Sequence, residues 1–339
     1  MQLPFVTLDV FTSTRFEGNP LAVISVPASR KTELTQAKKQ KIAQEFNLSE
    51  TVFMHEPSSS PSSNDDDDDQ KKEKEGATHL QIDIFTIESE LPFAGHPTIG
   101  SAVVAKFHWY PAVDTLLTKS GPIHIAESPP SGQGRSMRAR ISHDVRLHQK
   151  TLADVIPAAQ HASFPGLSHR LPAVRDAELR APVFSIVRGM TFALVQLPSL
   201  ELLGRLDRGL RLDFDHLPGP SLLDEDRQPA GFVARYYYGK EEEEDGDVNV
   251  RKIRTRMLEL GFEDPATGSA ASALAAYLTG ADRAEHVRFE ITQGVEMGRR
   301  SVIQVETKAE VQQGGDMKIR ELWLGGEAVV VQYGTLVVD

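Results

Sequence analysis

The sequence of 339 residues contains no cysteine. This absence excludes disulfide bonds, thiolate metal sites and every mechanism that depends on a cysteine thiol. The 11 histidines are scattered, and none shares with a carboxylate the spacing found in zinc proteases. No glycine-rich fingerprint for nicotinamide or flavin occurs. We therefore expect chemistry that needs neither a metal nor a cofactor.

Excess positive charge and long apolar runs are also missing. The net charge of −11 argues against nucleic acid or an anionic membrane surface as the main partner. No apolar run is long enough to span a bilayer, and residues 1–9 lack the basic and apolar regions of a signal peptide. These absences predict a soluble, cytoplasmic protein.

The most distinctive stretch present is EDPATGSAASALAAYLTG at residues 263–280. Asp264 can cap a helix there, Pro265 suits the first helical position and Gly280 suits the end. Because the segment is apolar on nearly every side, we expect a buried helix. Gly268 weakens that helix, which indicates that an anionic ligand group approaches its first turn.

A related pattern, HPTIGSA at residues 96–102, shares proline, glycine, serine and alanine in register with DPATGSA at residues 264–270. An apolar run follows in both places. We interpret the match as an internal duplication that yields two halves, each built around one buried helix. In this register His96 and Asp264 occupy equivalent cap positions at the two helix starts.

Short alternating or apolar segments predict strands around both helices. The main expected strands cover residues 5–10, 21–26, 52–54, 80–86, 182–187, 192–197, 231–238, 251–256, 287–291, 301–306 and 327–331. Further helices are expected over residues 32–46 and 150–156. Since regular alternation of strands and helices is absent, the pattern favours an α+β fold over a doubly wound dinucleotide-binding fold.

The length of 339 residues suits two domains. We expect an N-terminal domain over residues 1–119 and a C-terminal domain over residues 120–339, whose final strand crosses back to the first. Two acidic stretches, residues 57–76 and 241–247, cannot bury enough apolar surface to offset chain entropy. They are therefore predicted to be disordered loops.

Six segments occur in the order found in the phenazine biosynthesis PhzF-like family, and together they span nearly the whole chain. These segments are DVFT (9–12), GNPLAV (18–23), NLSET (47–51), ELPFAGHPT (90–98), EDPATGSA (263–270) and QGVEMGR (293–299). The chain resembles that family, which implies the diaminopimelate-epimerase-like fold. This fold has two pseudo-symmetric domains, each a curved, mostly antiparallel, barrel-like sheet around a central buried helix, with the active site in the cleft between them.

The resemblance also implies a mechanism. Cysteine-dependent epimerases of this fold use one thiol from each half, which this chain cannot do, so a carboxylate becomes the natural substitute. The acid/base glutamate of the family's characteristic isomerase matches Glu50 in NLSET. Such a base needs a pKa raised toward neutrality by burial. An isolated glutamate after a helix is ordinarily an exposed acid, and only the motif favours the catalytic role.

Further site residues are also implied by the resemblance. His96 would position substrate and assist proton movement, and Asp264 would hold a polar substituent, although capping alone would explain Asp264. The predicted substrate-binding residues are Asn19, Gly95, Gly268 and Ser269. Ser269 would offer a hydroxyl or backbone N–H to a carboxylate, unless it only serves packing. Asn19 has a role in a turn as its alternative.

The sequence therefore predicts a cofactor-independent isomerase or epimerase that moves a proton at carbon on a small carboxylate-bearing metabolite. Two alternatives stay open: a non-catalytic binding or scaffold protein that keeps the cleft, and a cofactor-free lyase or hydrolase that uses the same glutamate. A homodimer is expected because homodimers are common in the family. The acidic insertions, and Arg300 where proline is common, weaken any inference about the substrate because loops line such sites.

Overall fold

The computed structural model describes residues 1–57, 76–128, 135–209, 211–228, 231–241, 250–259, 263–312 and 317–339. Most of the two acidic stretches predicted to be disordered lies outside these residues. The chain forms two compact units, Met1–Arg140 with Leu324–Asp339, and Ile141–Trp323. The sequence placed this division after residue 119. Among the described residues, no helix is long and apolar enough to cross a bilayer.

The first unit contains a closed sheet of eight strands. In sheet order these are β1 (Gln2–Val10), β2 (Asn19–Val26), β3 (Thr51–His55), β4 (His79–Phe85), β6 (Thr115–Thr118), β7 (Gly121–Glu127), β8 (Arg135–Arg140) and β16 (Met317–Val337). Strand β16 pairs with β1 and closes the ring. Because β7 pairs with β6 and β8 pairs with β7, both strands belong to this unit.

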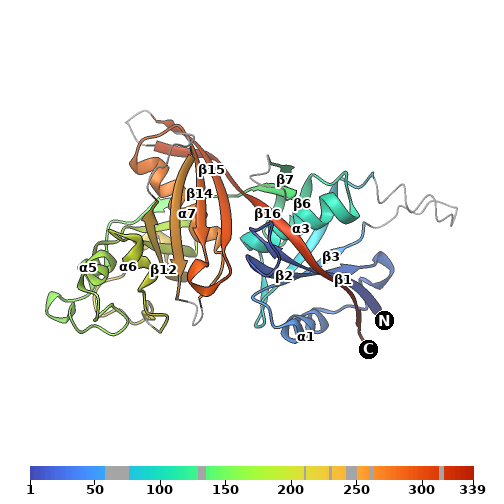
Figure 1. The fold of residues 1–339 in the computed structure, drawn as a ribbon, viewed down its shortest axis with the longest axis horizontal. Helices are drawn as coiled ribbons and strands as arrows, with labels where there is room; N and C mark the ends of the chain where they lie inside the picture. Colours follow the sequence, from blue (N-terminus) through green and yellow to red (C-terminus); the bar gives the residue numbers. More distant parts are fainter. Residues whose placement is uncertain are drawn as a thin grey trace. The chain divides into compact units, whose positions relative to one another are not determined.

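Two helices of the first unit connect parallel strands. Helix α1 (Gln36–Phe46) joins β2 to β3, and α3 (Gly95–Val104) lies between β4 and β6 (Figure 1). Every residue of α3 is buried, and the helix packs against β1, β2, β3 and β8. This is the first of the two central helices that the sequence predicts.

The second unit repeats this order of elements. Its strands, in sheet order after β16, are β15 (Ser301–Val311), β14 (His286–Gln293), β13 (Val250–Met257), β12 (Phe232–Lys240), β11 (Met190–Gln196), β10 (Val183–Val187) and β9 (Arg146–Leu147). Helix α6 (Leu200–Gly204) is part of the connection along the chain from β11 to β12, which pair in parallel. Helix α7 (Gly268–Ala281) connects the parallel strands β13 and β14 along the chain (Figure 1). It packs against β10, β14 and β15.

The predicted α+β class with two barrel-like halves is confirmed, and most of the pairings are antiparallel. Within the described part of the chain, the parallel pairings with a known register are β2–β3, β4–β6, β11–β12 and β13–β14. The two strands of each pair are joined by a crossover that contains a helix. The sequence did not predict that these strands pair in parallel. The same two crossovers in each unit support an internal duplication.

The predicted start of the first central helix was wrong. Helix α3 begins at Gly95, with Ala94 as the residue before it, so His96 is its second residue and not its cap. Assigning His96 to the cap position had made Pro97 the expected first helical residue, a position that proline favours. Pro97 does lie in that turn, as the third helical residue.

The predicted start of the second central helix was wrong too. Helix α7 begins at Gly268, three residues after Pro265. Asp264 does not cap it, because Asp264 instead forms an isolated antiparallel bridge with Met257 at the end of β13. The two helices therefore start at different points of the shared motif, α3 one residue before His96 and α7 four residues after Asp264.

A buried ion-pair cluster stabilises the second unit. The guanidinium of Arg235 binds Glu259 and, at 2.8 Å, Glu178. Glu178 also accepts a hydrogen bond of 2.6 Å from the Tyr237 hydroxyl. It lies on α5 (Pro172–Arg180), which packs against β11 and the short helix α4 (Leu152–Val155). Each charge in the cluster has a partner, as buried charges require.

Candidate active site

Glu50 is the last residue before β3. Helix α1 ends at Phe46, and its C-cap Asn47 adopts the left-handed conformation, with φ of 50° and ψ of 36°. Asparagine tolerates this conformation better than most residues and commonly ends helices in this way. The turn directs the NLSET segment from the helix into the sheet, where the Glu50 side chain is only 17% exposed.

The surroundings of Glu50 suit a group that exchanges protons. Burial raises the pKa of its carboxyl group above the ordinary value, and the Ser49 hydroxyl offsets part of that rise. Among the described residues, no group forms a hydrogen bond with Oε2 of Glu50. A buried carboxylate oxygen normally has such a partner. The hydrogen-bonding capacity of this buried atom is therefore left unused by the described part of the fold.

The structure brings His96 next to Glu50. Its Nε2 atom lies 3.5 Å from Oε2 of Glu50, and its side chain is 5% exposed. This distance exceeds that of a good hydrogen bond, but contacts between catalytic groups are often long until substrate binds. His96 and Glu50 thus form a buried pair in which both members can carry a proton.

Gly95 and Asn19 belong to the same unit as this pair. Gly95 is the buried first residue of α3, and no side chain caps that helix. The first N–H groups of a helix have no partner within the helix and favour anions. Asn19 is the first residue of β2, lies opposite Val10 of β1 and is 1% exposed.

Asp264, Gly268 and Ser269 belong to the second unit. Asp264 is 7% exposed, and its Oδ2 atom accepts a hydrogen bond of 2.6 Å from the Thr267 hydroxyl. Gly268 and the half-buried Ser269 open α7, which no side chain caps. The predicted site residues thus fall into two groups, one in each unit. That one substrate contacts both groups stays a prediction.

Gln293 holds the turn that carries Asp264. Its Nε2 atom donates to the Asp264 carbonyl at 2.8 Å and to the Thr267 hydroxyl at 3.0 Å. Its Oε1 atom accepts from the Thr267 N–H at 3.2 Å and from the Tyr236 hydroxyl at 2.8 Å. These four bonds use the full capacity of the amide, which is completely buried. Gln293 therefore fixes the Asp264 turn against β14 and β12.

The next residue, Gly294, allows the turn to pack this closely. It has a φ of +76°, and a Cβ atom at this position would lie 2.8 Å from the Pro265 carbonyl oxygen. At the start of the turn, Glu263 is held by Arg256 through bonds of 2.8 and 3.1 Å. Residues 293–299 were recognised from the sequence as a family segment, but no role was predicted for Gln293. Its position in that segment was the available signal.

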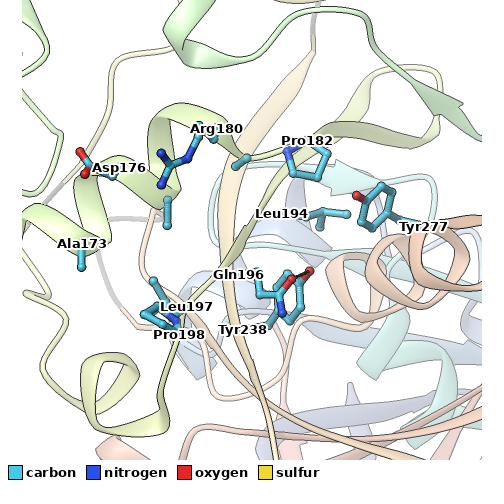
Figure 2. A pocket seen from close by; sticks show the side chains of 12 residues that line it. Ala173, Asp176, Arg180, Pro182, Leu194, Gln196, Leu197, Pro198, Tyr238 and Tyr277 are labelled. Carbon is cyan, nitrogen blue, oxygen red and sulfur yellow. Dashed lines mark hydrogen bonds between the residues drawn. The ribbon is translucent and has the colours of Figure 1, made fainter. Parts of the chain in front are cut away.

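A pocket of about 530 Å³ lies in the second unit, lined by residues of α5, β11, β12 and α7 (Figure 2). None of the predicted site residues lines it. The pocket is therefore distinct from the residues assigned to catalysis or substrate binding.

Residues 8–334 match the model of the family described as phenazine biosynthesis-like protein. The chain belongs to this family. The PhzF-like resemblance inferred from the sequence is thus confirmed.

The relatives of this PhzF-like protein include isomerases. It is 32% identical over 342 residues to an uncharacterized isomerase of Mesorhizobium japonicum, with 98% of each chain covered. It is 28% identical over 346 residues to the trans-2,3-dihydro-3-hydroxyanthranilate isomerase of Pseudomonas fluorescens, which covers 98% of this chain and 99% of the relative. A PhzF-family structure from Bacillus anthracis shares the fold, with a TM-score of 0.68 at 19% identity and complete coverage of both chains.

Proposed function

We propose that this PhzF-like protein is a cofactor-independent isomerase that moves a proton at carbon on a small carboxylate-bearing molecule. Glu50 removes the proton as a base and returns it as an acid. The observation that carries this proposal is the buried Oε2 atom of Glu50, which lacks a hydrogen bond to any described residue and lies 3.5 Å from His96. A base on a buried, pKa-raised carboxyl group suits abstraction from carbon.

The repeated fold supports a single acid/base group. Glu50 directly precedes β3, the second strand of the first parallel pair. The matching strand of the second unit is β12, and the residue before it is Gly231. Since the second unit has no carboxylate at this position, one group would both take and return the proton. This favours a proton shift within the substrate over inversion by two opposed bases.

The remaining residues would bind the substrate. The uncapped starts of α3 and α7 offer N–H groups to a carboxylate, with Gly95 and Gly268 allowing close approach. Negative charge that develops during proton abstraction would be stabilised by the same donors. Asp264 would hold a polar substituent, and Ser269 would add a hydroxyl.

Solvent-hydrogen exchange tests the proposed reaction. We expect at least one member of a panel of small cyclic carboxylates to gain one deuterium at carbon when incubated with the protein in D₂O, as measured by mass spectrometry. The relative from Pseudomonas fluorescens makes dihydro-hydroxyanthranilates the first compounds to try. Binding of a panel member without any exchange would favour the alternative, a non-catalytic binding protein. A product of different mass would instead favour a lyase or hydrolase.

Turnover should increase as pH rises through the raised pKa of Glu50, because only the ionised carboxylate is a base. The pH profile of kcat/KM reports this group in the free enzyme. Its midpoint is expected above the ordinary glutamate value and to agree with the titration of the Glu50 carboxyl carbon followed by ¹³C NMR. A titration midpoint at or below the ordinary value would contradict the assignment.

The free energy of unfolding should fall with rising pH over the range in which turnover increases. Since the folded-state pKa of Glu50 is raised, the folded protein binds more protons than the unfolded chain between the two pKa values. Stability is therefore lost as pH rises through this window.

Homodimer formation and a cytoplasmic location stay predictions.

A further inference from the structure

The pocket in the second unit is lined by hydrogen-bond donors from separate elements. Arg180 ends α5, Gln196 ends β11 and Tyr277 lies on α7 (Figure 2). Arg180 is exposed and has no ion-pair partner among the described residues. Its guanidinium group is therefore available to an anion.

The amide of Gln196 also presents a donor. Its Oε1 atom accepts a hydrogen bond of 3.2 Å from the hydroxyl of Tyr238, a buried residue that also lines the pocket. The NH₂ group of Gln196 is thus left to donate. Burial raises the pKa of both Tyr238 and Tyr277, so both phenols stay protonated at neutral pH.

One carboxylate, Asp176, lines the pocket among its described residues. Its Oδ1 atom lies 3.7 Å from Nε of Arg175, the preceding residue, so its charge has a partner outside the lining. An acidic ligand group can pair with Arg180 and accept hydrogen bonds from the neutral donors.

The remaining walls are mainly apolar. They are formed by Pro182, Leu194, Leu197 and Pro198 together with the ring of Tyr277. The volume of about 530 Å³ lies within the range of small-molecule sites, roughly 300–1,000 Å³. Proline and tyrosine surfaces of this kind suit an aromatic ring.

We propose that this pocket is a second binding site, which takes a small aromatic carboxylate whose acidic group pairs with Arg180 and whose ring packs against Tyr277 and the two prolines. The site is separate from the start of α7. Tyr277 follows Gly268 by nine positions, which corresponds to about 13 Å along the helix. The proposal therefore does not depend on the function assigned to Glu50.

Ligand-observed ¹⁹F NMR with 4-fluorobenzoate tests the second site. The affinity of the probe is measured for the wild-type protein, Arg180→Gln and Arg188→Gln. Arg188 is an exposed arginine of the same unit that does not line the pocket, so its variant controls for net charge. We expect Arg180→Gln to weaken binding about tenfold or more, since a charge-assisted contact is lost, and Arg188→Gln to bind like the wild type.

A neutral probe and a second variant sharpen the test. The isosteric 4-fluorobenzamide should bind at least about tenfold more weakly than 4-fluorobenzoate, because it cannot form an ion pair. Tyr277→Phe should weaken the benzoate to a lesser degree by removing one donor. Equal benzoate affinity for the wild type, Arg180→Gln and Tyr277→Phe, or no benzoate binding by the wild type at millimolar concentration, would overturn the proposal.

Discussion

Glu50→Gln is expected to lower kcat by about 1,000-fold or more while the dissociation constant of the substrate changes less than about threefold. The amide keeps the size of the side chain and its hydrogen-bonding oxygen, but it cannot accept a proton from carbon. A steady-state assay gives kcat, and titration calorimetry with the inactive variant gives the dissociation constant. The two measurements separate loss of chemistry from loss of binding.

Two controls accompany this variant. Glu45→Gln removes an exposed carboxylate from the last part of α1, five residues earlier, and should leave kcat unchanged. Glu50→Gln should also unfold less readily than the wild type at pH values above the raised pKa of Glu50, because the cost of burying its charge is gone. Retention of more than a tenth of the wild-type rate by Glu50→Gln would remove Glu50 from the mechanism.

Gln293→Met should raise KM about tenfold or more, with a smaller effect on kcat. Methionine fills similar space but breaks all four hydrogen bonds, which frees the Asp264 turn from β14. In the proposed mechanism, Gln293 is a positioning residue that acts through Asp264. The unfolding free energy should fall by about 2–4 kcal/mol, since buried partners are left unsatisfied. Kinetics and chemical denaturation together measure both effects.

Thr279→Val is the matched control because Thr279 forms buried hydrogen bonds at the other end of α7. Its Oγ1 atom lies 2.6 Å from Oγ1 of Thr307 and 2.8 Å from the Ala275 carbonyl. This variant should also lose stability but keep the wild-type KM. If Gln293→Met does not fold, Tyr236→Phe removes one of the four bonds and should raise KM modestly. An equal KM for the wild type and for whichever of these variants folds would refute the positioning role.

The buried central helices were predictable, whereas their first residues were not. Small apolar residues around the whole circumference of residues 268–281 leave burial as the stable solution. The capping rules that placed the start at Asp264 and Pro265 are local preferences. Here the bridge to Met257 and the bonds from Gln293 hold Asp264 in an extended turn, so tertiary contacts override those preferences.

Helix α5 and the parallel crossovers were missed for a similar reason. The buried face of α5 carries Glu178, whose partners Arg235 and Tyr237 lie more than fifty residues away. A charged residue at a core position hides the apolar period that would have revealed the helix. Parallel pairing likewise depends on which distant strands meet, which the pattern of one sequence does not encode.

Glu50 was predicted from a family segment and not from its own surroundings. In sequence it is one acid among many, and neither its burial nor its contact with His96, on a different element, follows from local pattern. The resemblance supplied the residue, and the structure supplied the reason it suits proton transfer. No family segment marked the pocket in the second unit, and only the folded chain shows it.

The central claim is that the Glu50 carboxylate carries the proton that moves during the reaction. Deuterium incorporation from D₂O into bound substrate, followed by mass spectrometry for the wild type and Glu50→Gln at saturating substrate, tests it most directly. The mechanism predicts one deuterium at carbon for the wild type and none for the variant over the same time. Incorporation by Glu50→Gln at the wild-type rate would contradict it.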